Sequence, residues 1–336
     1  KGHSDTEVLV AALEAWGLKT VLRKIVGMFA IALWDREKRE LTLIRDRMGE
    51  KPLYYGFVAG QFLFGSELKA IRAITGNKLK IDRDALAEFM QFGYVPSPRS
   101  IYSGISKISP GNILRVQSNS TELTQCPYWS IDSTEEGELS DRLSGCNDNE
   151  LIDLLHDQLR DSIGMQMVAD VPLGAFLSGG VDSSAVVALM QSQSAKPIRT
   201  FTIGFHEGMF NEAPYAKAVA EHLGTEHTEL YVSAKDAADV IPHLPLIYDE
   251  PFADSSQIPT TLVSRLTRQH VTVSLSGDGG DELFAGYPRY QLTSALWQKQ
   301  NQVPMFFRRT IAAILKSLSV QAWDRALKYL PKSKHQ

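Results

Sequence analysis

Phe176-Leu177-Ser178-Gly179-Gly180-Val181-Asp182-Ser183-Ser184 is a glycine-rich turn between an apolar strand and a helix. Residues 171–177 have the pattern of a short buried strand, and residues 185–190 have that of the apolar start of a helix. Adjacent glycines let backbone N–H groups approach an anion, and a helix N-terminus adds unpaired donors and a positive dipole end. The turn therefore predicts a site for the phosphates of a nucleotide.

Asp182 is the exception among these phosphate-binding groups, because a carboxylate repels phosphate unless a divalent cation lies between them. Magnesium is therefore implied at Asp182, and the hydroxyls of Ser178, Ser183 and Ser184 add further donors. No Gly-Lys-Ser/Thr follows, as it would in a Walker A loop, and the G-x-G-x-x-G of dinucleotide binders is absent. We expect ATP cleavage that releases pyrophosphate. The alternative is a tight turn whose Ser and Asp residues are helix N-caps.

The composition is that of an ordinary globular protein. The 336 residues are 43% hydrophobic and 22% charged, which allows two domains. A formal net charge of -4 gives no electrostatic reason for a nucleic-acid partner. The longest apolar stretches are too short to cross a bilayer, and the first residues lack the apolar core of a secretory signal. We expect small-molecule ligands, no nucleic-acid or membrane partner, and a cytoplasmic location.

The first 130 residues alternate helical patterns with short strand patterns. Residues 5–19 predict an amphipathic helix capped by Ser4 or Asp5 and ended by Gly17. An antiparallel sheet is predicted from four strand-like runs at 28–35, 40–45, 51–58 and 61–66. A helix at 82–92 and a hairpin at 111–125 follow, and the polar, acidic stretch 130–150 has the composition of a linker.

From residue 151 on, helices alternate with apolar strands. The predicted helices are 151–166, 184–193, 212–223, 235–247 and 258–269, and the predicted strands are 171–177, 199–205, 226–232 and 271–275. This alternation predicts a parallel sheet with helices on both faces. Ligands of such sheets bind at the carboxyl ends of the strands.

A second glycine-rich turn, Ser276–Glu282, follows the strand at 271–275 as the first turn follows its own strand. Because both turns stand at carboxyl ends of parallel strands, we expect them to face one crevice. Asp278, Asp281 and Glu282 would repel one another unless a cation or a positively charged ligand group neutralised them. The alternative is a solvated acidic turn.

These motifs together resemble those of the glutamine-hydrolysing asparagine synthetases and the wider asparagine-synthetase-like amidotransferases. The likeness spans nearly the whole chain and rests on Gly2–Glu7, Gly27–Ala30, Arg45–Tyr55, Ser178–Ser184 and Ser276–Tyr287. It implies a mixed α/β and α+β fold in two domains. These are a partial N-terminal Ntn-hydrolase (αββα) glutaminase domain over 1–130 and, after a linker at 131–150, a parallel-sheet PP-loop ATP pyrophosphatase domain over 151–336.

The resemblance implies a carbon–nitrogen ligase reaction. In that family the glutaminase domain frees ammonia from glutamine, and the PP-loop domain adenylates the side-chain carboxylate of aspartate. Ammonia passes through an internal tunnel and displaces AMP, which gives asparagine. The implied small molecules are ATP, aspartate, and glutamine or ammonia, with Mg²⁺, and a homodimer is an assembly that the sequence leaves open. The alternatives are adenylation of another carboxylate, such as a sugar acid, a cell-surface precursor or a lactam-forming β-amino acid, and a non-catalytic nucleotide-binding regulator.

The resemblance also implies roles for individual residues. Asp278 stands where many members have Glu, near the acyl adenylate and the incoming ammonia, and this difference weakens the assignment of aspartate more than that of ATP. Asp281 matches a second metal or substrate carboxylate, and Asp5 matches the carboxylate that holds the glutamine α-ammonium group, although a helix cap explains Asp5 equally well. The implied ATP contacts are Leu177, Ser178, Gly179, Gly180, Val181, Asp182, Ser183, Ser184, Ile203, Ser276 and Gly277. The implied substrate pocket, for which an ordinary polar loop is the alternative, is Asp249, Asp254, Ser255 and Tyr287.

The two ends of the sequence depart from the family pattern. The family's glutaminase nucleophile is a Cys at the mature N-terminus, whereas this sequence begins with Lys1, and it stops at Gln336 before a later family segment with a catalytic Lys. We therefore expect a fragment of a longer protein. By itself it should not hydrolyse glutamine, because neither Cys126 nor Cys146 can supply an N-terminal thiol and amine base.

Overall fold

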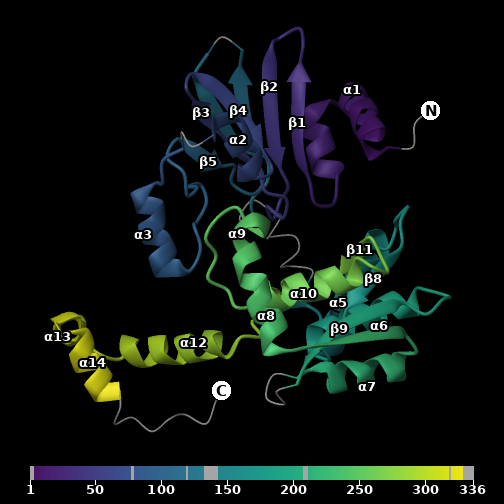
Figure 1. The fold of residues 1–336 in the computed structure, drawn as a ribbon, viewed down its shortest axis with the longest axis vertical. Coiled ribbons are helices and arrows are strands. Elements are labelled where there is room, and N and C mark those ends of the chain that lie inside the picture. The colour runs from purple at the N-terminus through teal and green to yellow at the C-terminus, as the bar shows by residue number, and fades with distance from the viewer. Residues whose placement is uncertain are drawn as a thin grey trace.

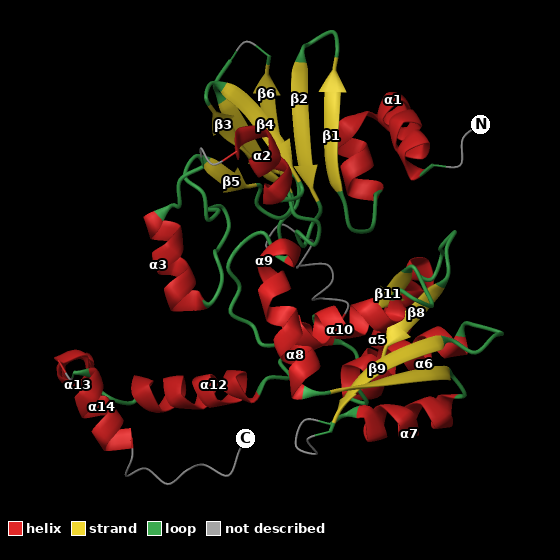
Figure 2. Cartoon of the chain, in the orientation of Figure 1, coloured by secondary structure: helices red, strands yellow, loops and turns green. Residues whose placement is uncertain are grey.

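The described residues of the computed structural model form two antiparallel sheets and one parallel sheet (Figures 1 and 2). The structure describes residues 4–76, 79–118, 120–131, 143–206, 211–317 and 319–327. Both antiparallel sheets lie in the first part of the chain, and the parallel sheet lies in the second. The mixed α/β fold with a parallel sheet is therefore confirmed.

The strands of the first part form two antiparallel sheets. The prediction of a single antiparallel sheet is therefore wrong. The sheet orders are β1-β2-β6-β7 and β4-β3-β5. The elements are α1 (Asp5–Lys24), β1 (Ala30–Asp35), β2 (Glu40–Arg45), β3 (Tyr54–Val58), β4 (Gln61–Gly65), α2 (Leu68–Thr75), α3 (Arg83–Phe92), β5 (Ile105–Lys107), β6 (Asn112–Gln117) and β7 (Leu123–Pro127). Runs of six to eight residues do not specify which strands will pair, because pairing depends on partners far along the chain.

Alternating side chains on these strands build four layers. On β2, Leu43 packs between the two sheets against Leu114, whereas its neighbour Ile44 faces the other way and packs against Leu22 of α1. On β3, Tyr54 faces α2 and α3. The order helix, sheet, sheet, helix is that expected for an αββα domain.

Two local predictions in the first part need correction. Gly17 does not end the first helix: it takes a non-helical conformation (φ 72°, ψ 160°) that kinks α1, and the helix continues to Lys24. The short elements α2 and β5 were not predicted. Ser4 caps α1 as expected, since its Oγ accepts a hydrogen bond from the N–H of Thr6 (3.2 Å).

The second part is a parallel sheet in the order β10-β9-β8-β11, with helices on both faces as predicted. Helices α5 to α7 cover the face that carries Leu177, and α8 and α10 cover the face that carries Phe201. The elements are α5 (Asp148–Gln166), β8 (Leu173–Phe176), α6 (Val181–Ser192), β9 (Arg199–Phe205), α7 (Ala213–Leu223), β10 (Glu226–Val232), α8 (Ala234–Val240), a 3₁₀ turn (Ile241–His243), α9 (Leu244–Ile247), α10 (Gln257–Thr267) and β11 (Val273–Leu275).

The helix predicted over 235–247 is interrupted. Pro242 and Pro245 each lack an N–H donor, and the chain forms two short helices joined by the 3₁₀ turn. Helix α5 begins at Asp148, inside the predicted linker, because Asn147 and Glu150 form a capping box. Residues 132–142 of that linker lie outside the described residues.

A helical arm follows the parallel sheet and extends to one side (Figure 1). It consists of α12 (Pro288–Asn301), α13 (Met305–Ser317) and α14 (Val320–Leu327), and α11 (Gly280–Phe284) precedes it. Its large apolar side chains lie in solvent: Trp297 is 60% exposed and Phe306 is 75% exposed. Within the residues that the structure describes, no helix is both long enough and apolar enough to cross a membrane.

Candidate functional site

The first glycine-rich turn packs tightly against the start of α7. Gly179 has φ +81°, and a Cβ at this position would lie 2.7 Å from the backbone of Tyr215 and Ala216. A side chain is therefore excluded by both conformation and space. The glycine keeps the turn close to the sheet and places Gly180 at the N-cap of α6.

Hydroxyl groups hold the shape of this turn. The Oγ atoms of Ser178 and Ser183 are 2.8 Å apart, and Ser178 Oγ also accepts a hydrogen bond from the N–H of Gly180 (3.2 Å). No side chain caps the N-terminus of α6, so the N-cap explanation of this motif does not hold. The first-turn N–H groups of a 12-residue helix are therefore left for an external acceptor such as a phosphate.

The second turn lies directly against the first, as predicted. A Cβ at Gly277 would lie 2.7 Å from the backbone N of Ser183, and a Cβ at Gly280 would lie 2.5 Å from Cγ of Asp182 and 2.6 Å from its Oδ2. Two glycines thus make room for the first turn of α6. The contact exists because β8 and β11 are parallel neighbours, with Leu275 beside Ala175.

The carboxylates near this contact suit a magnesium ion that is also bound by phosphates and water. Among the described residues, no three His, Cys, Asp or Glu side chains are arranged to hold a metal ion. Magnesium in nucleotide sites is commonly held by one or two carboxylates, with phosphates and water completing its octahedron. Asp182 could be one such carboxylate, because it lies in the first turn of α6, next to the N–H groups that are available to phosphate. Asp281 is half-buried in the first turn of α11, where a Cβ at Gly286 would collide with its Oδ1.

Two predicted ATP contacts belong to the core. Leu177 is 1% exposed as a whole residue, and its N–H donates to the carbonyl of Phe201 (3.0 Å), so it packs in the core rather than against a surface ligand. Ile203 is half-buried against Val232 and Leu262. By contrast, Ser184 Oγ is buried without a hydrogen-bond partner among the described residues.

The remaining predicted residues lie in different environments. Val181 is 85% exposed, and Ser276 Oγ donates to Asp278 Oδ2 (3.1 Å). The Tyr287 hydroxyl donates to Glu282 Oε1 (2.8 Å), and this bond raises the pKa of Tyr287 to about 12.

Asp254 and Ser255 lie in the turn that precedes α10. Asp254 Oδ1 accepts the N–H of Ser256 (2.8 Å), which lowers the pKa of Asp254. Asp5 lies far from these residues along the chain, exposed in the first turn of α1, where its Oδ1 accepts the N–H of Thr6 (2.7 Å).

Asp249 contacts the first part of the chain. Its carboxylate accepts the N–H of Lys69 (3.3 Å) and lies 3.6 Å from Lys69 Nζ. The next residue, Glu250, is also bonded to the first part. No local sequence pattern indicates these contacts, because the partners lie well over a hundred residues away.

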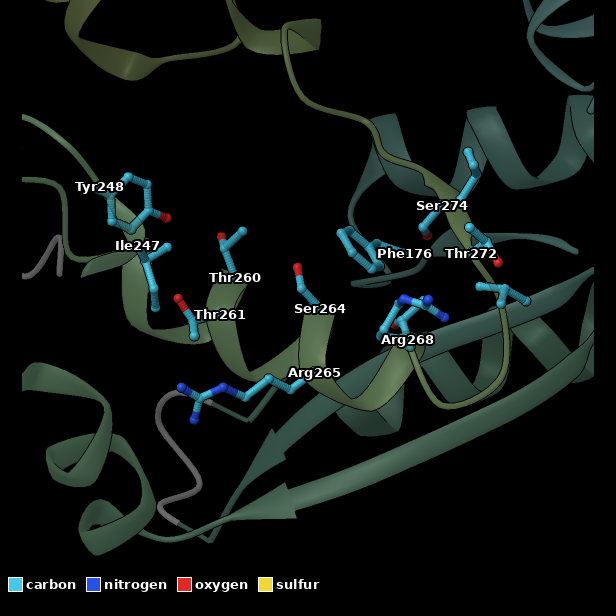
Figure 3. A pocket seen from close by; sticks show the side chains of 13 residues that line it. Phe176, Ile247, Tyr248, Thr260, Thr261, Ser264, Arg265, Arg268, Thr272 and Ser274 are labelled. Atoms are coloured by element: carbon cyan, nitrogen blue, oxygen red, sulfur yellow. The ribbon is translucent and has the colours of Figure 1, made fainter. Parts of the chain in front are cut away.

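A cavity of about 780 Å³ lies between α10 and the β8–β11 edge of the parallel sheet (Figure 3). It is lined by Phe176, by Ser274, and by polar residues of α10 and its end, including Ser264, Arg265 and Arg268. Of the two glycine-rich turns only Phe176, the strand-end residue of the first, contributes to this lining, so the cavity and the predicted phosphate-binding residues are separate features of the sheet.

Exchanging Gly280 for Ala is expected to abolish pyrophosphate release by the natural full-length protein. The added methyl would lie 2.5 Å from Cγ and 2.6 Å from Oδ2 of Asp182, so it would displace that carboxylate. Gly279→Ala is the matched control: it meets no atom within 4 Å, but its φ of +92° strains a side chain, which costs about 1–2 kcal/mol. Rate assays and thermal melts of both variants test this, and equal pyrophosphate release by the two variants would contradict it.

Comparison with known proteins identifies the family. The asparagine synthase family model matches residues 154–335, and a glutamine amidotransferase domain model matches residues 1–129. The first of these covers more than half of the chain. The chain therefore belongs to the asparagine synthase family.

Individual relatives agree with this assignment. A provisionally named asparagine synthetase (glutamine-hydrolysing) 2 of Methanocaldococcus jannaschii is 39% identical over 84% of this chain and 54% of its own length. Asparagine synthetase (glutamine-hydrolysing) 1 of Bacillus subtilis is 34% identical over 86% of this chain and 44% of its own length. The chain thus spans about half the length of the curated relatives it matches.

One solved structure with partial likeness is a glutamine phosphoribosylpyrophosphate amidotransferase from B. subtilis. It is 14% identical, covers 68% of this chain and 39% of its own, and has a TM-score of 0.28. At that score the likeness carries no argument about the fold of this chain.

Proposed function

We propose that the protein containing this chain makes asparagine from aspartate, with ATP as the energy source and glutamine as the nitrogen donor. The observation that carries the proposal is the contact between the two glycine-rich turns, in which Gly277 and Gly280 abut Asp182. Two phosphate-binding turns that follow adjacent parallel strands suit a nucleotide whose phosphate bond is cleaved. The family assignment supports the choice of ligase.

The proposed chemistry is adenylation of a carboxylate. A carboxylate is a poor electrophile, so the aspartate side chain attacks the α-phosphate of ATP, and pyrophosphate leaves. Ammonia then attacks the carbonyl carbon of β-aspartyl-AMP, AMP leaves, and the amide forms. The N–H groups at the start of α6 would bind phosphate oxygens and so orient the leaving pyrophosphate.

We propose that Asp182 and Asp281 hold Mg²⁺, which when bound would neutralise phosphate charge. Asp278 would lie near the acyl group, with Ser276 Oγ fixing its carboxylate through their hydrogen bond. Asp254, Ser255 and Tyr287 would line the acid pocket, whereas Asp249, the fourth residue predicted there, is bound to Lys69. Asp5 would hold the α-ammonium group of glutamine. The proposed nucleotide contacts are Leu177, Ser178, Gly179, Gly180, Val181, Asp182, Ser183, Ser184, Ile203, Ser276 and Gly277.

The proposed organisation is a glutaminase-type domain over 1–130, a linker over 131–150, and an ATP pyrophosphatase domain over 151–336. The limits of the two family matches, 1–129 and 154–335, support these boundaries. We propose a cytoplasmic enzyme with small-molecule partners and without nucleic-acid or membrane partners. Homodimer formation stays a prediction.

The test is pyrophosphate release by the natural full-length protein with Mg-ATP, ammonium and a panel of carboxylic acids. Aspartate should give pyrophosphate and asparagine in equal amounts. Release with a sugar acid or a β-amino acid but not with aspartate would refute asparagine synthesis and leave carboxylate adenylation standing. Release with none of the acids would favour a nucleotide-binding regulator.

A further inference from the structure

A buried carboxylate joins the two parts of the chain. Glu250 lies in the loop between α9 and α10, and its side chain is only 12% exposed. Its Oε1 accepts a hydrogen bond from the N–H of Ile101 (2.7 Å), and its Oε2 accepts one from the hydroxyl of Tyr54 (3.3 Å). The same Oε2 forms an ion pair with Lys107 Nζ (2.5 Å). These three partners all belong to the first part of the chain.

The partners of Glu250 form a preorganised set of hydrogen-bond donors. Tyr54 of β3 and Lys107 of β5 are directly paired residues of neighbouring strands. The Lys107 side chain is 14% exposed, and its Nζ also donates to the carbonyl of Val95 (2.6 Å). Burial, followed by the Glu250 charge, raises the pKa of Tyr54, so its hydroxyl remains a donor. Buried charges are stable only when they are paired and hydrogen-bonded, so Glu250 and Lys107 depend on each other.

Two further contacts flank Glu250 and tie the same segment to the first part. Asp249 binds Lys69 at the start of α2, and the N–H of Ala253 donates to the carbonyl of Gly93 at the end of α3 (2.8 Å). Pro251 lies between these two contacts, and its ring fixes φ, which restricts the conformations of the backbone there. We call residues 249–253 the bridge. It is attached to α2, to the β3–β5 pair and to the end of α3.

The bridge leads directly into the second part's proposed acid-binding residues. Asp254 and Ser255 follow it, then α10 begins at Gln257 and packs against the parallel sheet through Leu262 and Leu266. A displacement of Glu250 would therefore move the proposed acid pocket relative to the first part. Figure 1 shows α9, whose end precedes the bridge, directed toward the antiparallel sheets.

We propose that Glu250 is a positioning residue that aligns the two parts so that nitrogen released in one reaches the acyl group held in the other. This inference rests on the proposed function. Glu250 touches no reacting atom; it acts through the bridge. Small misplacements of reacting groups cost large factors in rate, so alignment should matter most when the nitrogen must travel between the parts. Ammonia supplied from solution should be far less sensitive.

The experiment compares Glu250→Gln with the unchanged natural full-length protein. Asparagine formed per glutamate released is measured with glutamine, and the rate of asparagine formation is measured separately with ammonium. We expect the ratio with glutamine to fall by about fivefold or more, and the rate with ammonium to stay within about twofold. Lys107→Met should reproduce this pattern, because it removes the other half of the ion pair.

Glu226→Gln is the matched control. It breaks an ion pair with Arg199 (3.3 Å) that lies wholly within the second part and is exposed on both sides, so the ratio should not change. An unchanged ratio in Glu250→Gln would overturn the inference. An equal fall in asparagine formation with glutamine and with ammonium would also overturn the inference, because it would indicate general damage to the protein rather than misalignment of its two parts.

Hydrogen–deuterium exchange separates this inference from the proposed function. Glu250→Gln should speed amide exchange in residues 93–107 and 249–257, and Glu226→Gln should not, whatever reaction the protein catalyses. If the unchanged protein makes no asparagine with either donor, the proposed function fails. If exchange in both segments is unchanged in Glu250→Gln, the bridge does not depend on this carboxylate and the inference fails.

Discussion

Replacing Asp182 with Asn is expected to lower pyrophosphate release by about 100- to 1,000-fold while the fold stays intact. Asn has nearly the same shape as Asp, so Gly277 and Gly280 still accommodate it. It carries no charge, however, and would bind Mg²⁺ much more weakly than a carboxylate, so the cation that would neutralise the phosphates would be held poorly. Initial rates with saturating Mg-ATP and acid, together with thermal melts, measure the two effects.

Asp84→Asn is the control for this substitution. Asp182 and Asp84 are both the second residue of a helix, in α6 and α3 respectively, so both substitutions remove the same favourable interaction with a helix dipole. Asp84 is 80% exposed and lies in the first part of the chain. Pyrophosphate release should be unchanged in Asp84→Asn. Release by Asp182→Asn within about tenfold of the unchanged protein would rule out a metal-binding role for Asp182.

Replacing Asp46 with Ala is expected to destabilise the first part of the chain by about 3–5 kcal/mol. Asp46 follows β2 and is 1% exposed, and its carboxylate accepts the N–H groups of Phe29 (3.3 Å), Glu50 (2.9 Å) and Lys51 (2.9 Å). Ala would leave all three donors without this acceptor in a buried site. Urea unfolding followed by tryptophan fluorescence measures the loss, since three of the five tryptophans, Trp16, Trp34 and Trp129, lie in the first part of the chain.

Asp35→Ala serves as the comparison, because Asp35 also accepts two backbone N–H groups, from Glu37 (3.0 Å) and Lys38 (2.9 Å). Its turn is exposed, so water replaces the lost acceptor and the destabilisation should be much smaller. Equal losses in the two variants would show that burial of Asp46 does not set the cost.

The sequence predicted the parallel sheet and the meeting of the two turns because both depend on short-range signals. Residues 199–205 and 226–232 are bounded by turn residues and contain β-branched and aromatic side chains, and both are strands with these limits. The Ser-Gly-Gly turn and its counterpart each follow a strand, and the carboxyl ends of parallel strands share one edge. Local pattern and a general topological rule were therefore sufficient for this part of the site.

The features that escaped prediction depend on contacts between distant residues. The strands of the first part divide between two sheets because Leu43 and Leu114 must share an interior with Leu53 and Ile108, which no local pattern specifies. Glu250 looked like an ordinary polar residue before a proline, and only the fold brings it to Lys107. In the same way, burial of Leu177 could not be separated from ligand contact by sequence alone.

The order of strands in the parallel sheet determines when the site is built during synthesis. Strand β8 pairs with β11 at Leu173 and Val273, a separation of one hundred residues (273 − 173 = 100). A nascent chain can form the first turn, α6 and β9 before Gly277 and Gly280 have been synthesised. Until β11 is added, one edge of β8 has no partner strand, and Asp182 lies beside an incomplete site. Closing so long a loop is a slow step. Ribosome-bound chains halted before and after β11 should therefore differ in their capacity to retain ATP, although both contain the complete first turn.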